Sequence, residues 1–596
     1  MRNLWNLFRE VLDVLPPAAR RFLIRYSVGL GALAVLDALA LTLLAVTITP
    51  IATGRPLVLP IFGTVDQLGI VFLLAAVCGF IILKSVLAVT LLWAATRKFA
   101  TYELLIGSRL FNSYIQAPWV ERLKRNAADL VRMTDSSVGL TISSFLLPAS
   151  TLLGEFMSFA VILVVLAIAQ PLIALTAVIY LGIVGFVLSI AVTRRSRQAG
   201  RVNIKYTQVT SRLVTEMIGA LKEVTLRNKT DEIAEVVRAN RVQTSRARSN
   251  IQFLAQIPRY VLESAIIGGF LLVGIVGYLS GGTAAAVTAI ALFGLAGFRM
   301  APSLVRFQSI ISQATAYAPH AEAVVQEIQA AEKSVEYLQD RDSKALPKKP
   351  KKLDFEHVGF SYSTDAAEAV SDVNLSIPFG TAVSFVGSSG AGKSTIIDLI
   401  LGLVEPTRGS ITIDGTPLEE LTHAWRSHVG YVPQDVALFD ATLGQNVALS
   451  WTGDYDRELA RECLAKAQLL ELVDSREGGL DAPVGERGLA LSGGQRQRLG
   501  IARALYSQPL VLVMDEATSA LDTATEAAVT KAIRGLHGKT TVVTVAHRLA
   551  TIQHSDVIFF MSQGKVEASG KFDELVANVP EFAVQARLAG LTGDSF

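Results

Sequence analysis

The chain has 596 residues, of which 51% are hydrophobic and 18% are charged, and its formal net charge is only +3. This length exceeds that of one ordinary domain, so at least two domains are expected. The hydrophobic fraction is high for a soluble enzyme of this size, and the apolar excess lies before residue 310. The small net charge gives no support to a nucleic-acid-binding function.

The two cysteines fall in different halves of the chain, Cys78 in an apolar stretch and Cys463 in the more polar half. We therefore expect no disulfide between them. Neither cysteine lies in a cluster with metal-ligand spacing, so both are predicted to be unpaired thiols.

The first 25 residues carry apolar side chains at helical spacing beside the basic residues Arg2 and Arg9. This pattern predicts that 1–25 form an interfacial elbow helix on the cytoplasmic membrane surface, before the first span. The same stretch is too polar to be the hydrophobic region of a cleavable signal peptide.

Six stretches of roughly 20 mostly apolar residues are long enough to cross a bilayer as helices. They cover 26–49, 68–93, 144–169, 172–192, 257–279 and 284–304. The long connections 94–140 and 193–255 are rich in Lys and Arg, whereas the opposite side offers little beyond Arg55. By the positive-inside rule, both connections and both ends of this region face the cytoplasm.

The two basic connections keep helical periodicity, so they predict helices that extend well beyond the bilayer. Short turns near Pro118 and near 219–226 are expected to touch the soluble half. A separate small cytoplasmic domain is a weaker explanation, because neither connection shows strand patterns. We therefore predict a six-helix transmembrane domain over 26–325, with long cytoplasmic helical extensions, and a linker over 326–350.

Ionisable residues inside membrane spans are energetically costly and are therefore candidates for function. In the predicted spans they are Asp37, Lys84, Glu155, Glu263 and Arg299. Asp37 and Glu155 are expected to pair with Lys84 or Arg299, or to line a water-filled cavity. Structural ion pairs, or positions near the span ends, explain these residues equally well.

After the basic segment 344–352 the pattern changes to short strands and turns, and 351–596 is predicted to form an α/β domain. A buried strand at 382–386, a glycine-rich loop and a helix from 393 give the context that a phosphate-binding loop requires. The loop residues are Gly387, Ser388, Ser389, Gly390, Ala391, Gly392, Lys393, Ser394 and Thr395. Backbone amides of such a loop hold phosphates, Lys393 reaches the terminal ones, and Ser394 ligates Mg²⁺.

Residues 511–516 predict an apolar strand that ends in two carboxylates, Asp515 and Glu516. In NTPases with this loop, the Asp at such a strand end helps to hold magnesium, directly or through water. Glu516 is placed to orient and polarise the attacking water. These residues predict a working hydrolytic site rather than a degenerate one.

The segment 491–495, Leu-Ser-Gly-Gly-Gln, resembles the signature sequence of ABC (ATP-binding cassette) proteins. In that family the signature of one copy faces the phosphate-binding loop of another, with ATP between them. The stretch 353–575 is similar to an ABC ATPase domain throughout, and the six-span half resembles an exporter-type transmembrane domain. The resemblance implies an exporter-type helical membrane domain fused to an α/β P-loop ATPase domain.

The resemblance also implies roles for residues outside the phosphate-binding loop. Tyr362 stacks on adenine, Gln434 touches magnesium or water, and His547 contacts the terminal phosphate. The partner's ATP is bound by Ser492, Gly493, Gly494 and Gln495, and Asp522 lies in the adjoining loop. Pro483 departs from the family pattern, because exporters of this type usually have an acidic residue there.

Because every ATP-site element is present, two copies would form two competent sites, and a homodimer is expected. The implied cofactors are ATP and Mg²⁺. The implied location is the cytoplasmic (inner) membrane, with several spans and a cytoplasmic ATPase domain. The expected partners are membrane lipids and an amphipathic substrate, and no nucleic acid. Transport by alternating access follows from the same resemblance.

Three short segments, 219–226, 298–303 and 398–403, resemble bacterial lipid-linked oligosaccharide flippases, as does the acidic Asp37 in the first span. This resemblance implies flipping of a lipid-linked oligosaccharide. Export of a drug, lipid or peptide is the alternative.

A pyrophosphate-linked glycan carries negative charge, so cationic side chains near the membrane would assist it. Arg259, Arg299 and Arg306 at the inner ends of the last two spans are candidates. They are equally well explained as ordinary positive-inside flanks.

Three other classes of ABC protein fit less well. A soluble DNA-repair ATPase is excluded by the six apolar spans, and an importer usually carries its spans on a separate chain. A non-transporting regulator or channel is disfavoured by Glu516, which indicates hydrolysis.

Overall fold

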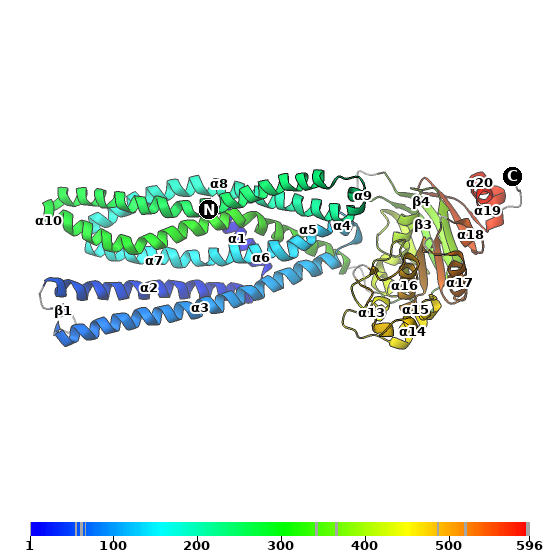
Figure 1. Ribbon diagram of the computed structural model, residues 1–596, viewed down its shortest axis with the longest axis horizontal. Helices are drawn as coiled ribbons and strands as arrows, with labels where there is room; N and C mark the ends of the chain where they lie inside the picture. The colour runs from blue at the N-terminus through cyan, green and yellow to red at the C-terminus, as the bar shows by residue number, and fades with distance from the viewer. Residues whose placement is uncertain are drawn as a thin grey trace. The chain divides into compact units, whose positions relative to one another are not determined.

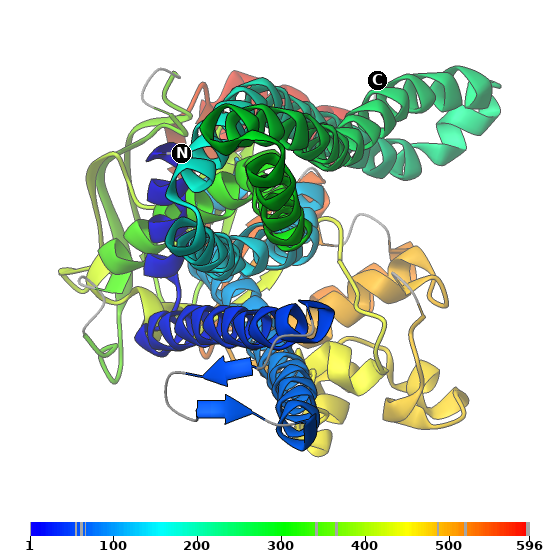
Figure 2. The ribbon, with the colours of Figure 1, turned by 90° about the vertical axis from the view of Figure 1, so that its left-hand side faces the viewer.

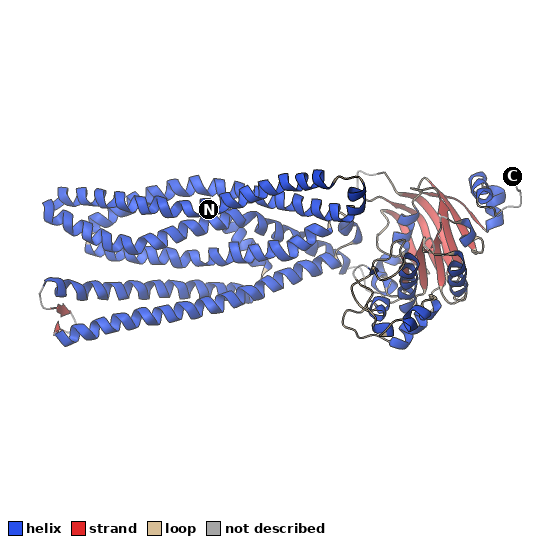
Figure 3. Cartoon of the chain, in the orientation of Figure 1, coloured by secondary structure: helices blue, strands red, loops and turns tan. Residues whose placement is uncertain are grey.

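The computed structural model describes residues 2–53, 57–59, 63–65, 67–124, 126–339, 344–363, 367–485, 488–517, 521–546 and 548–591. The chain divides into two compact units. Unit 1 comprises Met1–Ala117 and Arg122–Ser334, and unit 2 comprises Pro118–Glu121 and Val335–Phe596. Unit 1 is almost entirely helical, whereas unit 2 combines strands and helices (Figure 3). These are the two fold classes that the sequence predicts.

Unit 1 consists of long helices and one short β-hairpin (Figure 1). Its elements are α1 (Arg2–Val14), α2 (Pro17–Thr53), β1 (Leu57–Leu59), β2 (Gly63–Val65), α3 (Gln67–Gln116), α5 (Ala127–Arg132), η1 (Met133–Ser137), α6 (Val138–Leu140), η2 (Thr141–Leu146), α7 (Leu147–Ala169), α8 (Pro171–Gly219), α9 (Leu221–Leu226) and α10 (Thr230–Gln339). The elements η1 and η2 are π-helical. Figure 2 shows β1 and β2 as two antiparallel arrows between α2 and α3.

The six predicted spans fall on long helices. One lies on each of α2, α3, α7 and α8, the third beginning within η2, and α10 carries the last two on either side of a break. The break is at Gly281 and Gly282, where Gly282 has φ 74° and ψ −161°, a conformation that glycine adopts readily.

Four helical stretches in the described chain are long and apolar enough to cross a membrane: Val71–Gln116, Ala128–Ile168, Pro171–Gly219 and Thr230–Phe298. The last stretch combines the two spans of α10. The helix α2 is not among the four, and its side chains at 41–53 lie outside the described ones.

The helices α3 and α8 continue far beyond the predicted spans, to Gln116 and Gly219, as the periodicity of the basic connections predicts. The expected turns contain two short helices, α4 (Trp119–Leu123) and α9. The segment Pro118–Glu121 belongs to unit 2, and Trp119 and Val120 pack against the hydrophobic core of that unit.

The apolar stripe of α1 is used mainly for packing inside unit 1. Leu7, Val11 and Val14 are buried in a cluster that also contains side chains of α2, α3 and α10. Trp5, in contrast, is 56% exposed. Periodicity alone does not distinguish a stripe that faces protein from one that faces a membrane, and here most of the stripe faces protein.

Charged residues on the spanning helices form ion pairs. Lys84 on α3 lies 2.6 Å from Asp37 on α2, which is one of the predicted pairings. Glu155 on α7 pairs with Arg306 on α10 at 2.8 Å, a partner that the sequence does not predict, and no ion pair between Glu155 and Lys84 is present among the described residues. The side chain of Arg299 lies outside the described ones.

Glu263 makes an ion pair within its own helix. Its carboxylate lies 3.0 Å from the guanidinium of Arg259, one helical turn earlier. Side chains four residues apart on a helix are neighbours, so this pair needs no tertiary contact.

Unit 2 contains two sheets. Their strands are β3 (Lys352–Phe360), β4 (Val370–Pro378), β5 (Ala382–Gly387), β6 (Arg408–Ile413), β7 (Thr416–Pro417), β8 (Val429–Val432), β9 (Val511–Asp515), β10 (Thr541–Val545), β11 (Val557–Ser562) and β12 (Lys565–Gly570). The helices are α11 (Lys393–Ile400), η3 (Leu418–Glu420), α12 (Thr422–Arg426), α13 (Leu443–Ala448), α14 (Arg457–Lys466), α15 (Leu470–Ser475), η4 (Gly479–Asp481), α16 (Gly493–Tyr506), α17 (Thr523–Arg534), α18 (Leu549–Ile552), α19 (Phe572–Asn578) and α20 (Pro580–Leu588).

The larger sheet has the order β12-β11-β5-β10-β9-β8, and every neighbouring pair except β11–β12 is parallel. The strands β5, β10 and β9 are adjacent, so their carboxyl ends meet at one edge of the sheet. Gly387, Asp515 and Val545 end these three strands. Ligands of open α/β sheets bind at such an edge.

Candidate functional site

The glycine-rich loop links β5 to α11, and its glycines are required by close backbone contacts. A Cβ on Gly387 would lie 2.1 Å from the carbonyl oxygen of Met561, and one on Gly392 would lie 2.7 Å from that of Ala369. Gly392 also has φ 97°, in the left-handed region that favours glycine. Any side chain at these two positions would push the loop away from its neighbours.

Lys393 begins α11 and folds back over the loop. Its Nζ donates hydrogen bonds to the carbonyl oxygens of Gly387 at 2.7 Å and Ser388 at 2.9 Å, and the residue is only 7% exposed. Burial lowers the pKa of the Lys393 ammonium, while the nearby Glu516 and Asp515 carboxylates oppose that shift. A buried ammonium beside two acids is suited to bind an anionic group that enters the loop.

Loop and strand ends surround one cavity of about 590 Å³. Its lining includes the predicted site residues Ser389, Gly390, Gly392, Lys393, Ser394, Thr395, Gln434, Asp515 and Glu516. Ala369 and Val545 also line it. The structure therefore brings together residues from five separated parts of the sequence.

Glu516 follows β9 and is held at several points. Its backbone N–H donates to the carbonyl of Val545 at 3.0 Å, and its Oε2 accepts from Nε2 of Gln434 at 3.0 Å. Its φ of 50° lies in the left-handed region, which is uncommon for a residue with a side chain. Backbone strain of this kind is found at functional sites when the surrounding contacts enforce it.

Gln497 is a residue that the sequence motifs do not identify. It lies on α16, is 3% exposed, and donates from Nε2 to the carbonyl oxygen of Glu516 at 3.2 Å. This hydrogen bond stabilises the strained backbone conformation at Glu516. The only signal in the sequence is a glutamine two positions after the signature, on a face of the helix that is otherwise apolar.

The signature segment caps α16. Ser492 accepts a hydrogen bond from the N–H of Gln495 at 3.2 Å, and the Gln495 side chain accepts from the N–H of Ser492 at 2.9 Å, which forms a capping box. Gly493 and Gly494 make up the first turn. None of these four residues is among those that line the loop cavity of the described chain.

Tyr362 follows β3 and points its hydroxyl group at α11. Its Oη lies 3.2 Å from Oγ1 of Thr395 and 3.4 Å from a carboxylate oxygen of Asp398. Burial raises the pKa of the Asp398 carboxyl to about 6, with the hydrogen bond from Tyr362 opposing the shift and Asp515 adding to it. Asp398 is absent from the predicted site, because its link to Tyr362 depends on tertiary packing.

The last two predicted site residues are Asp522, which does not line this cavity, and His547. Asp522 is the N-cap of α17, where its side chain accepts from the N–H of Thr525 at 3.0 Å. This hydrogen bonding lowers the pKa of Asp522. His547 lies outside the described residues.

The site residues are suited to nucleotide chemistry. A glycine loop at a helix N-terminus offers backbone N–H groups to phosphates. Ser394, Gln434 and Asp515 present oxygen ligands to the same cavity, the type that Mg²⁺ prefers, together with phosphate oxygens.

Comparisons with known proteins agree with this geometry. Residues 370–519 match the family model of the ABC transporter. The chain is 31% identical over 496 residues to an ATP-dependent lipid A-core flippase of Ralstonia nicotianae, which covers 79% of this chain and 80% of that relative. The chain belongs to the exporter-type ABC transporters. This exporter is therefore an ATP hydrolase coupled to transmembrane transport, with spanning helices and a cytoplasmic ATPase domain.

Other matches of this exporter are shorter or more distant. It is 42% identical over 235 residues to a multidrug resistance ABC transporter ATP-binding and permease protein of Lactococcus lactis, covering 39% of this chain and 40% of that relative. Another relative, the ABC transporter ATP-binding protein YwjA of Bacillus subtilis, is covered over 41% of its length. The structure of a bacterial Atm1-family ABC exporter with ATP bound covers 97% of this chain with a TM-score of 0.75 at 20% identity. That likeness confirms the fold.

Proposed function

We propose that this exporter flips a lipid-linked oligosaccharide across the cytoplasmic (inner) membrane and works as a homodimer. The observation that carries the proposal is the length of the match to the lipid A-core flippases. An alignment of 496 residues is far longer than unit 2, so it extends well into the membrane helices. The substrate is bound by that part of an exporter, so similarity there is more informative than similarity in the ATPase.

The alternative substrate class is a drug, another lipid or a peptide. Its support is the multidrug resistance relative, whose match of 235 residues is too short to cover both units. ATPase domains are similar among exporters of different substrates, so this match carries less weight for the cargo.

The charges near the inner ends of the spans give only limited support to recognition of an anionic headgroup. Arg306 and Arg259 are 60% and 59% exposed at their side chains, but each is already paired with a carboxylate. A pyrophosphate group would have to displace Glu155 or Glu263 to bind them. The lipid character of the cargo is therefore the firmer part of the proposal.

The nucleotide cavity is proposed to bind ATP and Mg²⁺. Lys393 would exchange its two carbonyl contacts for the terminal phosphates, and Ser394, Gln434 and Asp515 would hold the metal directly or through water. Glu516 would orient the attacking water, and His547 would contact the terminal phosphate. The Tyr362 ring would stack on adenine.

A second copy is required to complete each site in this proposal. Ser492, Gly493, Gly494 and Gln495 do not line the loop cavity of their own chain. ATP held by one copy would meet these residues and Asp522 from its partner. Closure of two such sites would pass to the membrane helices through Pro118–Glu121, whose Trp119 packs on the core of unit 2.

The test is ATPase activity of the full-length protein in lipid nanodiscs, with and without a polyprenyl-pyrophosphate-linked glycan. Glu516→Gln serves as the hydrolysis blank. We expect stimulation by the glycolipid, and a smaller stimulation in Arg306→Gln than in Arg238→Gln, an exposed arginine that also pairs with a carboxylate. Basal activity that ignores the glycolipid but rises with amphipathic drugs or peptides would replace this proposal with the alternative.

A further inference from the structure

A second cavity in unit 2 lies beside the strained turn at Glu516. This lateral pocket has a volume of about 340 Å³ and is bounded by α17 on one side and by residues 548–555 on the other. Its floor is apolar, with Met514 of β9, Val542 of β10 and Ile533 of α17. A volume above about 300 Å³ with an apolar lining is typical of sites for small organic ligands.

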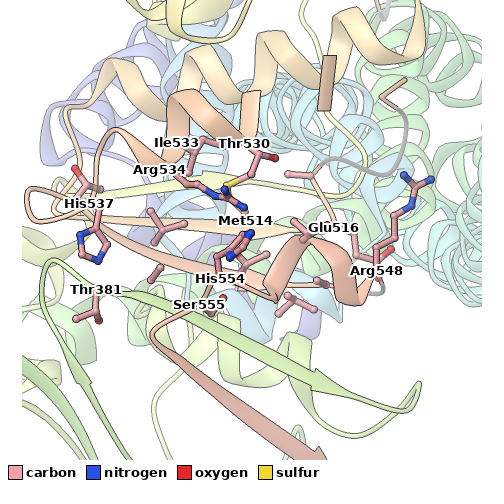
Figure 4. Close-up of a pocket in the computed structure, with 18 residues that line it drawn as sticks. Thr381, Met514, Glu516, Thr530, Ile533, Arg534, His537, Arg548, His554 and Ser555 are labelled. Carbon is pink, nitrogen blue, oxygen red and sulfur yellow. The ribbon is translucent and has the colours of Figure 1, made fainter. Parts of the chain in front are cut away.

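Two basic residues of the lining, Arg534 and His554, make no side-chain hydrogen bond or ion pair within the described part of the chain. In Figure 4 the side chains of both residues point toward the middle of the group of lining residues. An arginine presents five N–H donors and a histidine at least one, so this region has donors available for an anion.

The other basic residues of the lining show the contrast. Arg548 is paired with Glu526 at 3.1 Å, and His537 lies 3.0 Å from Asp556. The one acidic residue among the described lining residues is Glu516, and its carboxylate accepts from Gln434 in the nucleotide cavity. The free donors of the lateral pocket are therefore not balanced by a carboxylate of their own.

Two threonines add neutral hydrogen-bonding groups to the walls. Thr530 of α17 and Thr544 of β10 line the pocket and are partly buried, and no side-chain hydrogen bond is recorded for either among the described residues. Most exposed or partly buried threonines on the helices of this chain donate to the carbonyl one turn earlier, as Thr210 does at 2.7 Å. A ligand with oxygen acceptors would satisfy Thr530 and Thr544.

The pocket shares residues with the nucleotide cavity. Glu516 and Val545 line both cavities, and the N–H of Glu516 donates to the carbonyl of Val545. A molecule in the lateral pocket would therefore touch the backbone that fixes the orientation of the Glu516 carboxylate. Small displacements at a residue that orients the attacking water have large effects on rate.

We propose that the lateral pocket binds an amphipathic organic carboxylate, and that its occupancy changes the rate of ATP hydrolysis. The carboxylate is bound by Arg534 and His554 at the mouth. An aromatic or aliphatic body of about naphthalene size packs on Met514, Val542 and Ile533. This regulatory site lies within unit 2, and the proposal does not depend on which substrate the exporter moves.

The experiment uses the full-length protein in nanodiscs with 6-fluoro-2-naphthoate, observed by ¹⁹F NMR. The neutral 6-fluoro-2-naphthalenemethanol tests whether binding requires the carboxylate. Inorganic phosphate, added as a competitor, tests whether binding also requires the apolar body. Empty nanodiscs measure how much of the probe partitions into lipid. Loss of a charge-assisted hydrogen bond weakens binding by roughly tenfold or more. We therefore expect at least that increase in Kd for the double variant Arg534→Gln, His554→Gln.

Two further variants keep the test decisive. Thr530→Trp fills the pocket and should abolish naphthoate binding, while Arg461→Gln, an exposed arginine paired with Asp474 on the surface, should leave it unchanged. Naphthoate should change the kcat of ATP hydrolysis in the wild type and in Arg461→Gln, and in neither pocket variant. Melting temperatures verify that each variant is folded.

Three outcomes would overturn the proposal. Equal naphthoate binding by the double variant and the wild type would show that Arg534 and His554 do not hold the carboxylate. Binding equal to that of empty nanodiscs would show that only lipid takes up the probe. Displacement of naphthoate by ADP would place the probe in the nucleotide cavity instead.

Discussion

The two units of this exporter keep their important side chains in place by different means. In unit 2, Lys393, Gln434, Asp515 and Glu516 sit at or just beyond the ends of neighbouring elements, where the sheet order brings them to one cavity. In unit 1, Asp37, Lys84 and Glu155 lie in the middle of long helices and meet partners on other helices. The first arrangement is built from local motifs, and the second from tertiary packing.

This difference separates the chemistry from the selectivity of the protein. A glycine-rich loop binds phosphates in the same way in all phosphate-loop NTPases, so its residue types and spacing are constrained by phosphate geometry. Side chains along a membrane helix are constrained by the transported substrate and by the side chains packed against them. Changes to the residues that line the nucleotide cavity of unit 2 should therefore abolish turnover, whereas changes to the paired charges of unit 1 should first alter stability.

The largest expected effect is that of Glu516→Gln. The amide retains the shape of the side chain and its contact with Gln434 but does not accept the proton of the attacking water. We expect the kcat of phosphate release to fall roughly a hundredfold or more, with ATP-bound dimers accumulating. Glu471→Gln, an exposed glutamate on α15, is the matched control. Undiminished phosphate release by Glu516→Gln would refute the role assigned to this carboxylate.

The same contrast explains what the sequence predicts. The phosphate loop, the acidic strand end and the signature occur as contiguous motifs, and all the described members of the first two, except Gly387, Ser388 and Ala391, line one cavity. Gln497 and Asp398 are not predicted, because they reach the site across turns of helices whose packing no local motif records. The helices and their extensions follow from hydrophobic length and periodicity.

The sequence does not determine which charged residues of unit 1 form ion pairs with one another. Asp37 and Lys84 are matched as predicted, but Glu155 pairs with Arg306, a cation outside its predicted pairings, because the packing of α10 against α7 decides which side chain faces it. The apolar stripe of α1 is a similar case. Its periodicity is correct for an amphipathic helix, and only the fold shows that protein covers most of it.

The second prediction tests the ion pair between α2 and α3. Lys84→Met removes the ammonium group that pairs with the Asp37 carboxylate, whose side chain is only 10% exposed. Removal of one partner of a buried pair costs about 3–5 kcal/mol, whereas replacing both partners by apolar residues costs much less. We expect a clear fall in the melting temperature for Lys84→Met in nanodiscs, and recovery in the double variant with Asp37→Leu.

The pair between Arg259 and Glu263 provides the control for that experiment. Its side chains are 59% and 52% exposed, and both lie on one helix. Such pairs contribute less than about 1 kcal/mol. If Arg259→Gln lowered the melting temperature as much as Lys84→Met, the distinction between tertiary and local pairs in unit 1 would be lost.

The third prediction concerns Asp398, a tertiary contact at the edge of the local site in unit 2. Burial raises the pKa of its carboxyl from 3.8 to about 6, so the folded state favours the protonated form. Its contribution to stability is present below about pH 4 and is lost as the pH rises through 6. Asp398→Asn should therefore stabilise unit 2 at pH 7.5 by up to about 3 kcal/mol and should flatten the pH dependence of its melting temperature between pH 4 and 6. A variant that melts with the same pH dependence as the wild type would show that Asp398 ionises freely.

The smallest expected effect compares two glycines of α8, and it tests how closely the cytoplasmic extensions pack. A Cβ on Gly200 would lie 1.9 Å from the carbonyl oxygen of Ala316, so Gly200→Ala must push α8 and α10 apart. Overpacking of this kind costs about 1–3 kcal/mol. Gly182 has no atom within 4 Å of such a Cβ, so Gly182→Ala should be neutral or stabilising by up to about 1 kcal/mol. In nanodiscs, the melting temperature should fall for Gly200→Ala and should be unchanged or higher for Gly182→Ala. If Gly200→Ala had the same melting temperature as Gly182→Ala, the backbones of α8 and α10 would have room to adjust. The cytoplasmic extensions would then be less rigid than their close approach indicates.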